Sequence, residues 1–393
     1  MNTHFRLTSD YFTTDECRLE DLASLAERRL TKADVPLAAD IQKNIPIYDV
    51  PALADDLADP AARQALMGEW ARVLHSSAGV FALSKAQEDQ AAIDDATAIF
   101  NRIIKEEKAA GGDGADHFAA AGSNDRIWNS LQKLCFASPE TYVRYYACPA
   151  VDAAAEAWLG PNYQMTVQVN LVYPGGKAQQ PHRDYHLGFQ TAEVCAHYPA
   201  HVHDLSPLLT LQGGIAHCDV PVDGGPTKLL PFSQLYRPGY VAWRRDDFRQ
   251  YFEDHFVQLP LKKGDAMFFN PALLHAAGDN RTPDLHRLMN LMQISSPFGR
   301  AMESVDRVRM CKTVYGALQN AWADGRLSQA QLHAVVASTA EGYSFPSNLD
   351  NDPPTGALAA ETQAAHLKHA ITSNMPVDEF ARLLDQREAV KRP

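Results

Sequence analysis

Residues 164–172 read QMTVQVNLV, and polar and apolar side chains alternate along this stretch. Successive side chains of a β-strand point to opposite faces of its sheet, so Gln164, Thr166, Gln168 and Asn170 share one face. Polar residues facing inward would be wasteful in an ordinary core, but they suit the wall of a ligand cavity. The stretch therefore predicts a strand with an apolar core face and a face that lines a site.

Further strands are predicted on the C-terminal side of this one, separated by glycine, proline and aspartate. Their sequences are LLTLQGGIAHCDV (208–220), TKLLPF (227–232), FVQLPL (256–261), DAMFFN (265–270) and RLMNLMQIS (287–295). Several short strands with distant partners favour a sandwich or a barrel.

Helical patterns surround this β-rich region. They cover residues 52–110 and 124–158 and return after residue 298. We therefore expect one catalytic domain over 1–393, with a mainly helical part at 1–160, a β core at 163–298 and a helical extension at 299–393. The two helical parts are expected to wall the mouth of the barrel.

The composition is that of an ordinary globular chain, with 46% hydrophobic residues, 21% charged residues and a net charge of −12. The acidic balance argues against nucleic acid and anionic membranes as partners. No run of eighteen apolar residues occurs, the N-terminus lacks a signal-peptide pattern, and six cysteines are scattered without a Cys-x-x-Cys pair. These features predict a cytoplasmic protein with reduced thiols and leave its oligomeric state open.

The triplet His182-Arg183-Asp184 and the distant His275 are the candidate metal ligands. Positions i and i+2 of a strand share a face, so His182 and Asp184 can approach one ion together. His275 would supply a third ligand from another strand. Two imidazoles and one carboxylate on one side of an ion leave positions open opposite them, which is typical of non-heme Fe(II) oxygenases. Arg287 is placed to bind a carboxylate.

A zinc site built from His182 and His186, four residues apart, is an alternative. Pro181 and Gly188 bracket a segment that is not expected to be helical, and no His-Glu-x-x-His order is present, so the iron interpretation is favoured. No glycine-rich phosphate loop occurs, which argues against nucleotide binding.

Four stretches together resemble the phytanoyl-CoA dioxygenase family of Fe(II)/2-oxoglutarate oxygenases: HRDYH (182–186), DGGPTKLLPFSQ (223–234), GDAMFFNPALLHAAGDN (264–280) and Arg287. The resemblance implies an α+β protein with a double-stranded β-helix core, a cupin-like jelly roll. It also implies that His182, Asp184 and His275 bind Fe(II), and that Arg287 holds the far carboxylate of the cosubstrate 2-oxoglutarate. Dioxygen would be the second cosubstrate.

Some assignments stay open. Arg281 competes with Arg287, although it lies in a polar turn. Gln168 and Asn170 are expected either to contact the cosubstrate or to form hydrogen bonds within the barrel. Ala277 lacks a hydroxyl often found in the family at its position, and Gln212-Gly213-Gly214 replaces a bulkier segment.

The implied reaction is oxidation of a small organic molecule, such as an amino acid or a natural-product intermediate, with release of succinate and CO2. The outcome would be hydroxylation, desaturation or oxidative cyclisation, because Asp184 is a carboxylate where related halogenases have a small residue. The alternatives are a metal enzyme on the same barrel that does not use 2-oxoglutarate, and a non-catalytic binding protein.

Overall fold

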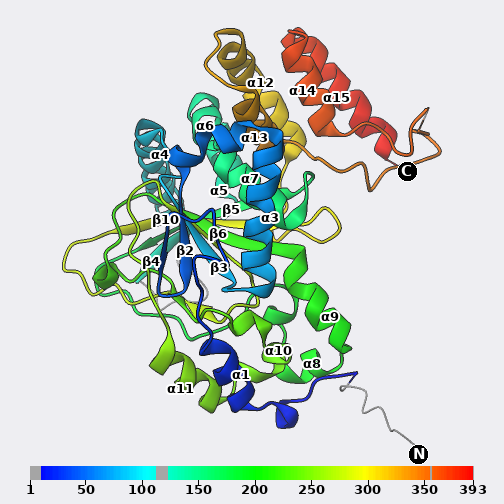
Figure 1. Cartoon of the computed structure of the whole chain (residues 1–393). Helices are drawn as coiled ribbons and strands as arrows, with labels where there is room; N and C mark the ends of the chain where they lie inside the picture. The colour runs from blue at the N-terminus through cyan, green and yellow to red at the C-terminus, as the bar shows by residue number, and fades with distance from the viewer. Residues whose placement is uncertain (1–9, 112–122, 355, 393) are drawn as a thin grey trace, which may run out of the picture.

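The fold is built on a mixed sheet of eight strands (Figure 1). A computed structural model of the chain describes residues 10–111, 123–354 and 356–392. Strands β2 and β3 are parallel, and every other pair in this sheet is antiparallel. In spatial order the strands are β1 (Asp40–Gln42), β2 (Ile45–Asp49), β3 (Val80–Ser84), β8 (Ala266–Phe269), β6 (Thr210–Ala216), β10 (Arg287–Ser295), β5 (Gln164–Val172) and β4 (Asn124–Ile127).

A smaller antiparallel layer packs on one face of this sheet. It consists of β7 (Lys228–Leu229) and β9 (His275–Ala276), and single backbone bridges join His182 to His275 and Leu229 to Val257. One apolar cluster contains side chains of both layers, among them Val80, Met267, Leu229 and Leu261. Two packed layers of mainly antiparallel strands confirm the predicted α+β jelly-roll class.

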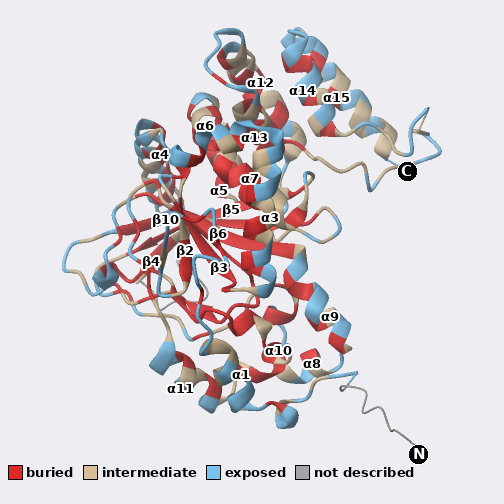
Figure 2. Cartoon of the chain, viewed as in Figure 1, coloured by how far each residue is buried: buried red, intermediate tan, exposed pale blue. Residues whose placement is uncertain are grey.

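Helices cover the opposite face of the large sheet. Met165, Val167 and Val169 of β5 belong to the cluster that joins this face to the helices, as the alternation of residues 164–172 predicted. Figure 2 shows buried residues concentrated in the sheet and in the helices next to it. The helices of this layer are α3 (Pro60–Ser76), α4 (Gln90–Ala109), α5 (Ser130–Ala137), α6 (Pro139–Tyr146), α7 (Pro149–Leu159) and α13 (Gln329–Thr339).

Five shorter helical segments and the N-terminal helix gather at the edge of the small layer (Figure 1). Cys17, Leu22, Tyr240 and Phe252 belong to one apolar cluster there, which ties the N-terminal segment to residues 236–252. The elements are α1 (Leu19–Ala26), η3 (His186–Phe189), α8 (Ala192–Ala196), α9 (Ala200–Leu205), α10 (Gly239–Ala242) and α11 (Asp246–His255).

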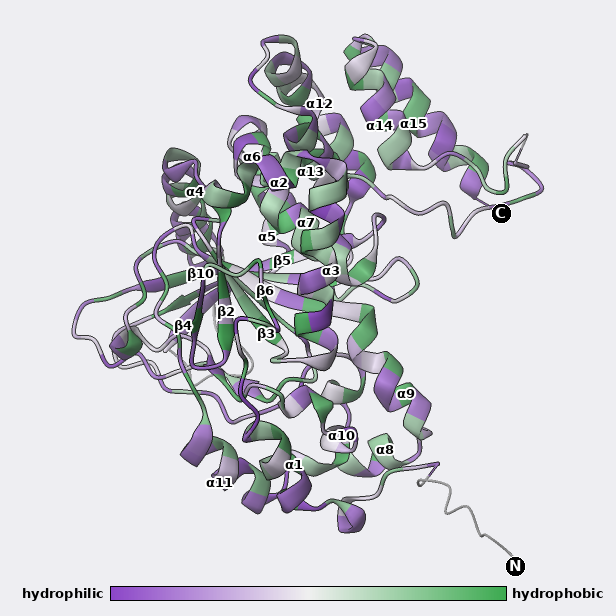
Figure 3. Ribbon diagram, in the orientation of Figure 1, coloured by the Kyte–Doolittle hydropathy of each residue, from purple (hydrophilic) through white to green (hydrophobic). Residues whose placement is uncertain are grey.

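The C-terminal extension is helical, as predicted. Tyr315 stacks on Phe380 with 4.3 Å between ring centroids, which joins the last helix to α12. Figure 3 shows hydrophilic and hydrophobic residues alternating around α14 and α15, as expected of helices with one buried face. The bounds are α12 (Arg307–Ala323), α14 (Gln363–Thr372) and α15 (Val377–Lys391), and the short α2 (Ala54–Ala58) precedes α3. Among the described residues, no helix is both long and apolar enough to cross a membrane.

The predicted limits of the β core were too narrow. Strands β1 to β4 lie within residues 40–127, so half of the large sheet comes from the part expected to be mainly helical. The helical patterns at 52–110 and 124–158 also contain β3 and β4. Every residue of β3 except Ser84 is buried, so the strand shows no alternation that would separate it from a helix.

Candidate metal centre

Two backbone hydrogen bonds place the two candidate histidines side by side. The His182 N–H donates to the His275 carbonyl at 3.0 Å, and the His275 N–H donates to the His182 carbonyl at 3.2 Å. Paired residues of antiparallel strands direct their side chains to the same face, and the two imidazole centroids lie 4.4 Å apart. Asp184, two residues after His182, joins them, and one ligand atom from each of the three residues lies within 4.8 Å of the others.

Each imidazole is oriented by its own strand. His182 Nδ1–H donates to the Gln180 carbonyl at 2.8 Å, and His275 Nδ1–H donates to the Leu273 carbonyl at 2.9 Å. Both Nε2 atoms therefore face Asp184, at 3.5 Å from its Oδ1 and 3.4 Å from its Oδ2. A hydrogen bond at Nδ1 that leaves Nε2 for the ion is the usual arrangement of histidine ligands.

Asp184 is held from two sides. Its backbone N–H donates to the Pro271 carbonyl at 3.0 Å, and Gln212 Nε2 donates to its Oδ2 at 2.6 Å. Burial alone would raise the pKa of this carboxyl group, but His182 and His275 outweigh burial and hold the pKa well below its ordinary value. Asp184 is therefore a carboxylate at neutral pH. Two imidazole nitrogens and one carboxylate oxygen fit a ferrous ion and leave coordination positions open toward the cavity.

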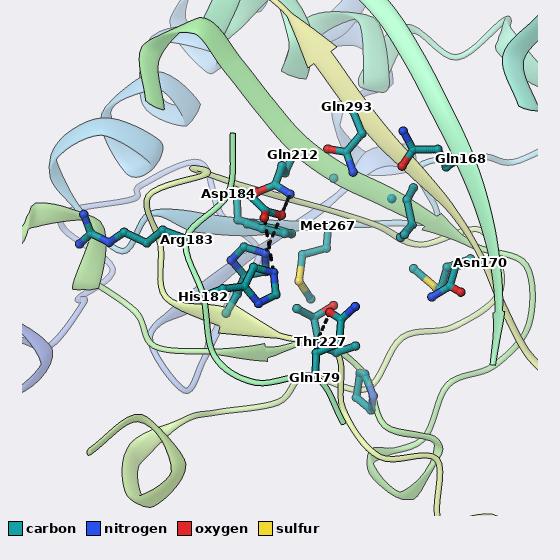
Figure 4. A pocket seen from close by; sticks show the side chains of 18 of the residues that line it. Gln168, Asn170, Gln179, His182, Arg183, Asp184, Gln212, Thr227, Met267 and Gln293 are labelled. Carbon is teal, nitrogen blue, oxygen red and sulfur yellow. Dashed lines mark hydrogen bonds and ion pairs between the residues drawn. The ribbon is translucent and has the colours of Figure 1, made fainter. Parts of the chain in front are cut away.

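Arg183, the middle residue of the triplet, points away from this centre (Figure 4). Its Nη2 donates to the carbonyls of Ser233 at 2.6 Å and Tyr236 at 2.9 Å. Gly239 leaves the space for the guanidinium, since a Cβ there would lie 1.9 Å from Arg183 Cζ. Arg183 thus anchors the ligand-bearing segment to the neighbouring loop.

The metal centre opens into a cavity of about 680 Å³, a size common for small-molecule sites. Residues 287, 289, 291 and 293 of β10 line it in alternation, as do Met267 and Phe269 of β8. From the parts outside 163–298, only Arg126 and Met302 belong to the described lining. The expectation that helical parts wall the mouth is therefore wrong: those helices lie mainly on the other face of the sheet.

Arg287 lines one end of the cavity. It is 5% exposed, and its Nη1 donates to the carbonyls of Gly224 at 3.1 Å and Gly278 at 3.2 Å. Burial lowers the pKa of the guanidinium to about 10, so it is still charged at neutral pH. Within the described ranges no carboxylate forms an ion pair with Arg287. Arg281 does have such a partner, because it is exposed and lies 2.8 Å from Asp223.

Gln168 and Asn170 both line the cavity, and both also form hydrogen bonds inside the barrel. Arg126 Nη1 donates to Gln168 Oε1 at 3.4 Å, and Asn124 Nδ2 donates to Asn170 Oδ1 at 3.1 Å. The two expected roles are therefore compatible for these residues, and cosubstrate contact stays a prediction.

Five further cavity residues were not predicted as site residues. Gln212 was noted only as a departure from the family pattern, and Thr227 lies inside a stretch that carried the resemblance. Gln179 lies next to the ligand triplet in sequence. Trp243 and Arg244 follow a short helix, where nothing in the sequence distinguishes them from surface residues.

The zinc alternative is not supported. His186 is the first residue of η3, so it does not share a regular helix with His182, and its Nε2 lies 3.3 Å from Thr210 Oγ1. A second cluster of metal-binding residue types, Asp152, Glu156 and His333, surrounds Arg63. The guanidinium lies 3.0 Å from Asp152 and 2.5 Å from Glu156, so this cluster is an ion-pair network.

Comparisons with known proteins identify the family of the chain. The family model for phytanoyl-CoA dioxygenase (PhyH) matches residues 54–289. The chain is 26% identical over 158 residues to "Dioxygenase trt7" of Aspergillus terreus, covering 40% of this chain and 49% of that protein. It is 28% identical over 182 residues to the peroxisomal phytanoyl-CoA dioxygenase of Rattus norvegicus, covering 42% and 49%. The aligned part thus spans about half the length of these curated relatives.

The comparison with solved structures gives two partial matches among others. The non-heme α-ketoglutarate-dependent carbocyclase SnoK from nogalamycin biosynthesis has a TM-score of 0.44 and 16% identity, covering 68% of this chain and 92% of that chain. The epimerase SnoN from the same biosynthesis has a TM-score of 0.41 and 22% identity, covering 61% and 82%.

Proposed function

The chain belongs to the phytanoyl-CoA dioxygenase (PhyH) family, and from this premise we propose that it is an Fe(II)- and 2-oxoglutarate-dependent oxygenase of a small organic molecule. The observation that carries the proposal is the convergence of His182, Asp184 and His275 within 4.8 Å beside a cavity with a buried arginine. Because Asp184 supplies a carboxylate ligand, the proposed outcome is hydroxylation, desaturation or oxidative cyclisation.

His182, Asp184 and His275 would hold the ferrous ion, which supplies the activation of dioxygen when bound. Gln212 keeps the Asp184 carboxylate in place through its 2.6 Å hydrogen bond. In the neutral imidazoles, the Gln180 and Leu273 carbonyls select the tautomer with the proton on Nδ1, which leaves the Nε2 lone pairs directed at the ion. The chain therefore prepares three ligands whose orientation does not depend on solvent.

Arg287 would bind the distal carboxylate of 2-oxoglutarate. A guanidinium presents a planar pair of donors that matches the two oxygens of a carboxylate. Its Nη1 is held by two carbonyls, which fixes the side chain, and no described carboxylate neutralises its charge. Leu261, Met267 and Phe269 line the same cavity and would exclude water from the reacting groups.

The test is formation of succinate from 2-oxoglutarate by protein reconstituted anaerobically with Fe(II) and then exposed to dioxygen with a library of small metabolites. We expect succinate that depends on Fe(II), and stimulation by the true substrate. Asp184→Ala should abolish succinate formation while its thermal unfolding without added metal stays close to that of the unaltered protein.

Three results would refute the proposal. The first is normal succinate formation by Asp184→Ala, which would remove the ligand assignment. The second is binding of Fe(II) without any conversion of 2-oxoglutarate, which would favour a metal enzyme that does not use this cosubstrate. The third is failure to bind Fe(II) at all, which would favour a non-catalytic binding protein.

A further inference from the structure

Besides Arg287, which is assigned to the cosubstrate, Arg126, Arg183 and Arg244 are cationic residues of the cavity lining. Trp243 and Arg244 follow α10, and both residues line the cavity. The indole of Trp243 lies 6.4 Å from the His182 imidazole, measured between ring centroids. The Arg244 guanidinium carbon lies 3.9 Å from the indole centroid, so the cation is one aromatic ring away from a metal ligand.

Both residues have donors without an acceptor. Arg244 Nη2 donates to the Gly188 carbonyl at 3.2 Å, but the Arg244 Nη1 and Trp243 Nε1 groups are buried and have no hydrogen-bond partner among the described residues. No ion pair within the described ranges includes Arg244. Arg244 therefore brings a positive charge to the cavity wall without an ion-pair partner in the described part of the chain, and such a charge suits an anionic ligand.

The neighbouring Arg249 is a second cation beside the same indole. Its guanidinium carbon lies 5.8 Å from the Trp243 centroid, and its Nη1 lies 3.9 Å from the Asp246 carboxylate. Arg249 does not line the cavity. Of the two cations on this ring, only Arg244 lines the cavity.

The other walls of the cavity define the rest of the ligand. Gln212 Oε1 is buried without a partner, and its identity as the oxygen follows from the donation of Nε2 to Asp184. This oxygen can accept a hydrogen bond next to the metal centre. Tyr185, Phe189, Leu291 and Met302 supply apolar surface between the polar groups.

We propose that the substrate is a carboxylic acid with an apolar body, whose carboxylate binds the Arg244 guanidinium at the cavity wall beside the Trp243 indole. This inference rests on the proposed function and names the substrate class of the same site. One guanidinium balances the one negative charge of a carboxylate. A hydroxyl or amino group on the same molecule would donate to Gln212 Oε1 and hold the reacting carbon beside the iron.

The test uses a panel of aliphatic and aromatic carboxylic acids of graded length, each paired with its primary amide and with the phosphate ester of the matching alcohol. Binding is measured as the thermal shift of the metal-free protein and of the protein loaded with Fe(II) and 2-oxoglutarate under anaerobic conditions. Stimulation of succinate release is measured in parallel. The variants are Arg244→Gln, Trp243→Phe and the matched control Arg249→Gln.

We expect some acids to bind and to stimulate succinate release where their amides do not. Arg244→Gln should weaken those acids about ten- to a hundredfold, which corresponds to loss of a hydrogen bond to a charged group. Trp243→Phe should weaken them less, and Arg249→Gln should leave them unchanged. The concentration of 2-oxoglutarate giving half-maximal succinate release should stay the same in all three variants.

The inference is overturned if no acid binds better than its amide, or if Arg244→Gln and Arg249→Gln behave alike. Preference for the phosphate esters would overturn the carboxylate class. Acid binding that depends on Arg244 without any Fe(II)-dependent succinate would instead refute the proposed function. Succinate formation without preference for acids would refute only this inference.

Discussion

At the scale of single residues, the short spacing of His182 and Asp184 made it predictable that both side chains lie on the same side of their segment. The alternation of a strand puts His182 and Asp184 on one side and Arg183 on the other, and the structure shows this division. Trp243 and Arg244 could not be predicted in the same way. Whether these two side chains reach the cavity depends on the surface against which α10 packs. The periodicity of the sequence does not predict that packing.

The sharpest residue-scale prediction concerns the two arginines near His275. Arg287→Gln should raise the 2-oxoglutarate concentration for half-maximal succinate release about a hundredfold, because it leaves a carboxylate without its buried partner. Arg281→Gln should change it by less than about twofold, since an exposed ion pair contributes little. Iron binding, measured by titration under anaerobic conditions, should be unchanged in both. Equal effects of the two substitutions would contradict the assignment of Arg287.

At the scale of elements, the glycines of β6 explain a departure from the family pattern. Gly213 lies opposite Phe268 of β8, and a Cβ at position 213 would lie 2.4 Å from Phe268 Cδ1 and 2.7 Å from the Met267 carbonyl oxygen. A larger residue would push β6 away from β8. Because Gln212 is the adjacent residue, this close packing also positions the side chain that holds Asp184.

Gly213→Ala should therefore destabilise the protein by about 1–3 kcal/mol, the usual range for overpacking a tight core. Gly316→Ala is the matched control: Gly316 lies within α12, and a Cβ there meets no atom within 4 Å. That control should stabilise the protein by up to about 1 kcal/mol through higher helix propensity. Urea unfolding of both variants measures the difference, and a Gly213→Ala variant as stable as the control would refute the packing explanation.

The strand β5, which has one polar face, was predictable from its alternation, whereas the short and fully covered β3 was not. Residues 164–172 alternate because helices cover one face and the cavity lies on the other. The short β3 is covered on both faces: Phe81 packs with the helices and Val80 with the small layer. The hydrophobicity of such a strand does not alternate with a period of two. From the sequence alone, its residues are therefore assigned to the helical patterns on either side.

At the scale of the whole molecule, a buried histidine links the helices to the sheet. His217 Nε2 accepts from the Tyr145 hydroxyl at 2.8 Å, and that hydroxyl accepts from Asn290 Nδ2 at 3.0 Å. His217 Nδ1–H donates to Thr97 Oγ1 at 2.8 Å, whose hydroxyl donates to the Ile93 carbonyl at 2.7 Å. Each donor in this chain of hydrogen bonds has one acceptor, and His217 Nε2 is itself an acceptor. The hydrogen-bond network therefore requires a neutral His217 imidazole.

The pH dependence of stability follows from this network. Burial, helped by the positive charge of Lys263, lowers the pKa of His217 to about 3, whereas an unfolded histidine titrates near 6.5. The unfolded chain therefore binds the proton first, and stability is full above pH 6.5 and falls as the pH drops toward 3. The contribution lost between pH 7 and pH 5 is about 2 kcal/mol.

Urea unfolding at pH 7 and pH 5 measures this loss. His217→Gln should be less stable at pH 7 and should lose less stability on acidification than the unaltered protein. His201→Gln, which alters an exposed histidine, should keep the full pH dependence. An unchanged pH dependence in His217→Gln would rule out His217 as its source.

The reciprocal backbone bonds between His182 and His275 also bear on metal choice. Main-chain pairing fixes the spacing of these imidazoles, so the ligand geometry is the same whether the ion is iron or a competing metal. Copper, nickel and zinc bind nitrogen and oxygen donors more tightly than ferrous iron does. A fixed ligand geometry of this kind gives ferrous iron no advantage over these metals. Loading with iron in the cell then depends on which free metal ions surround the protein as it folds.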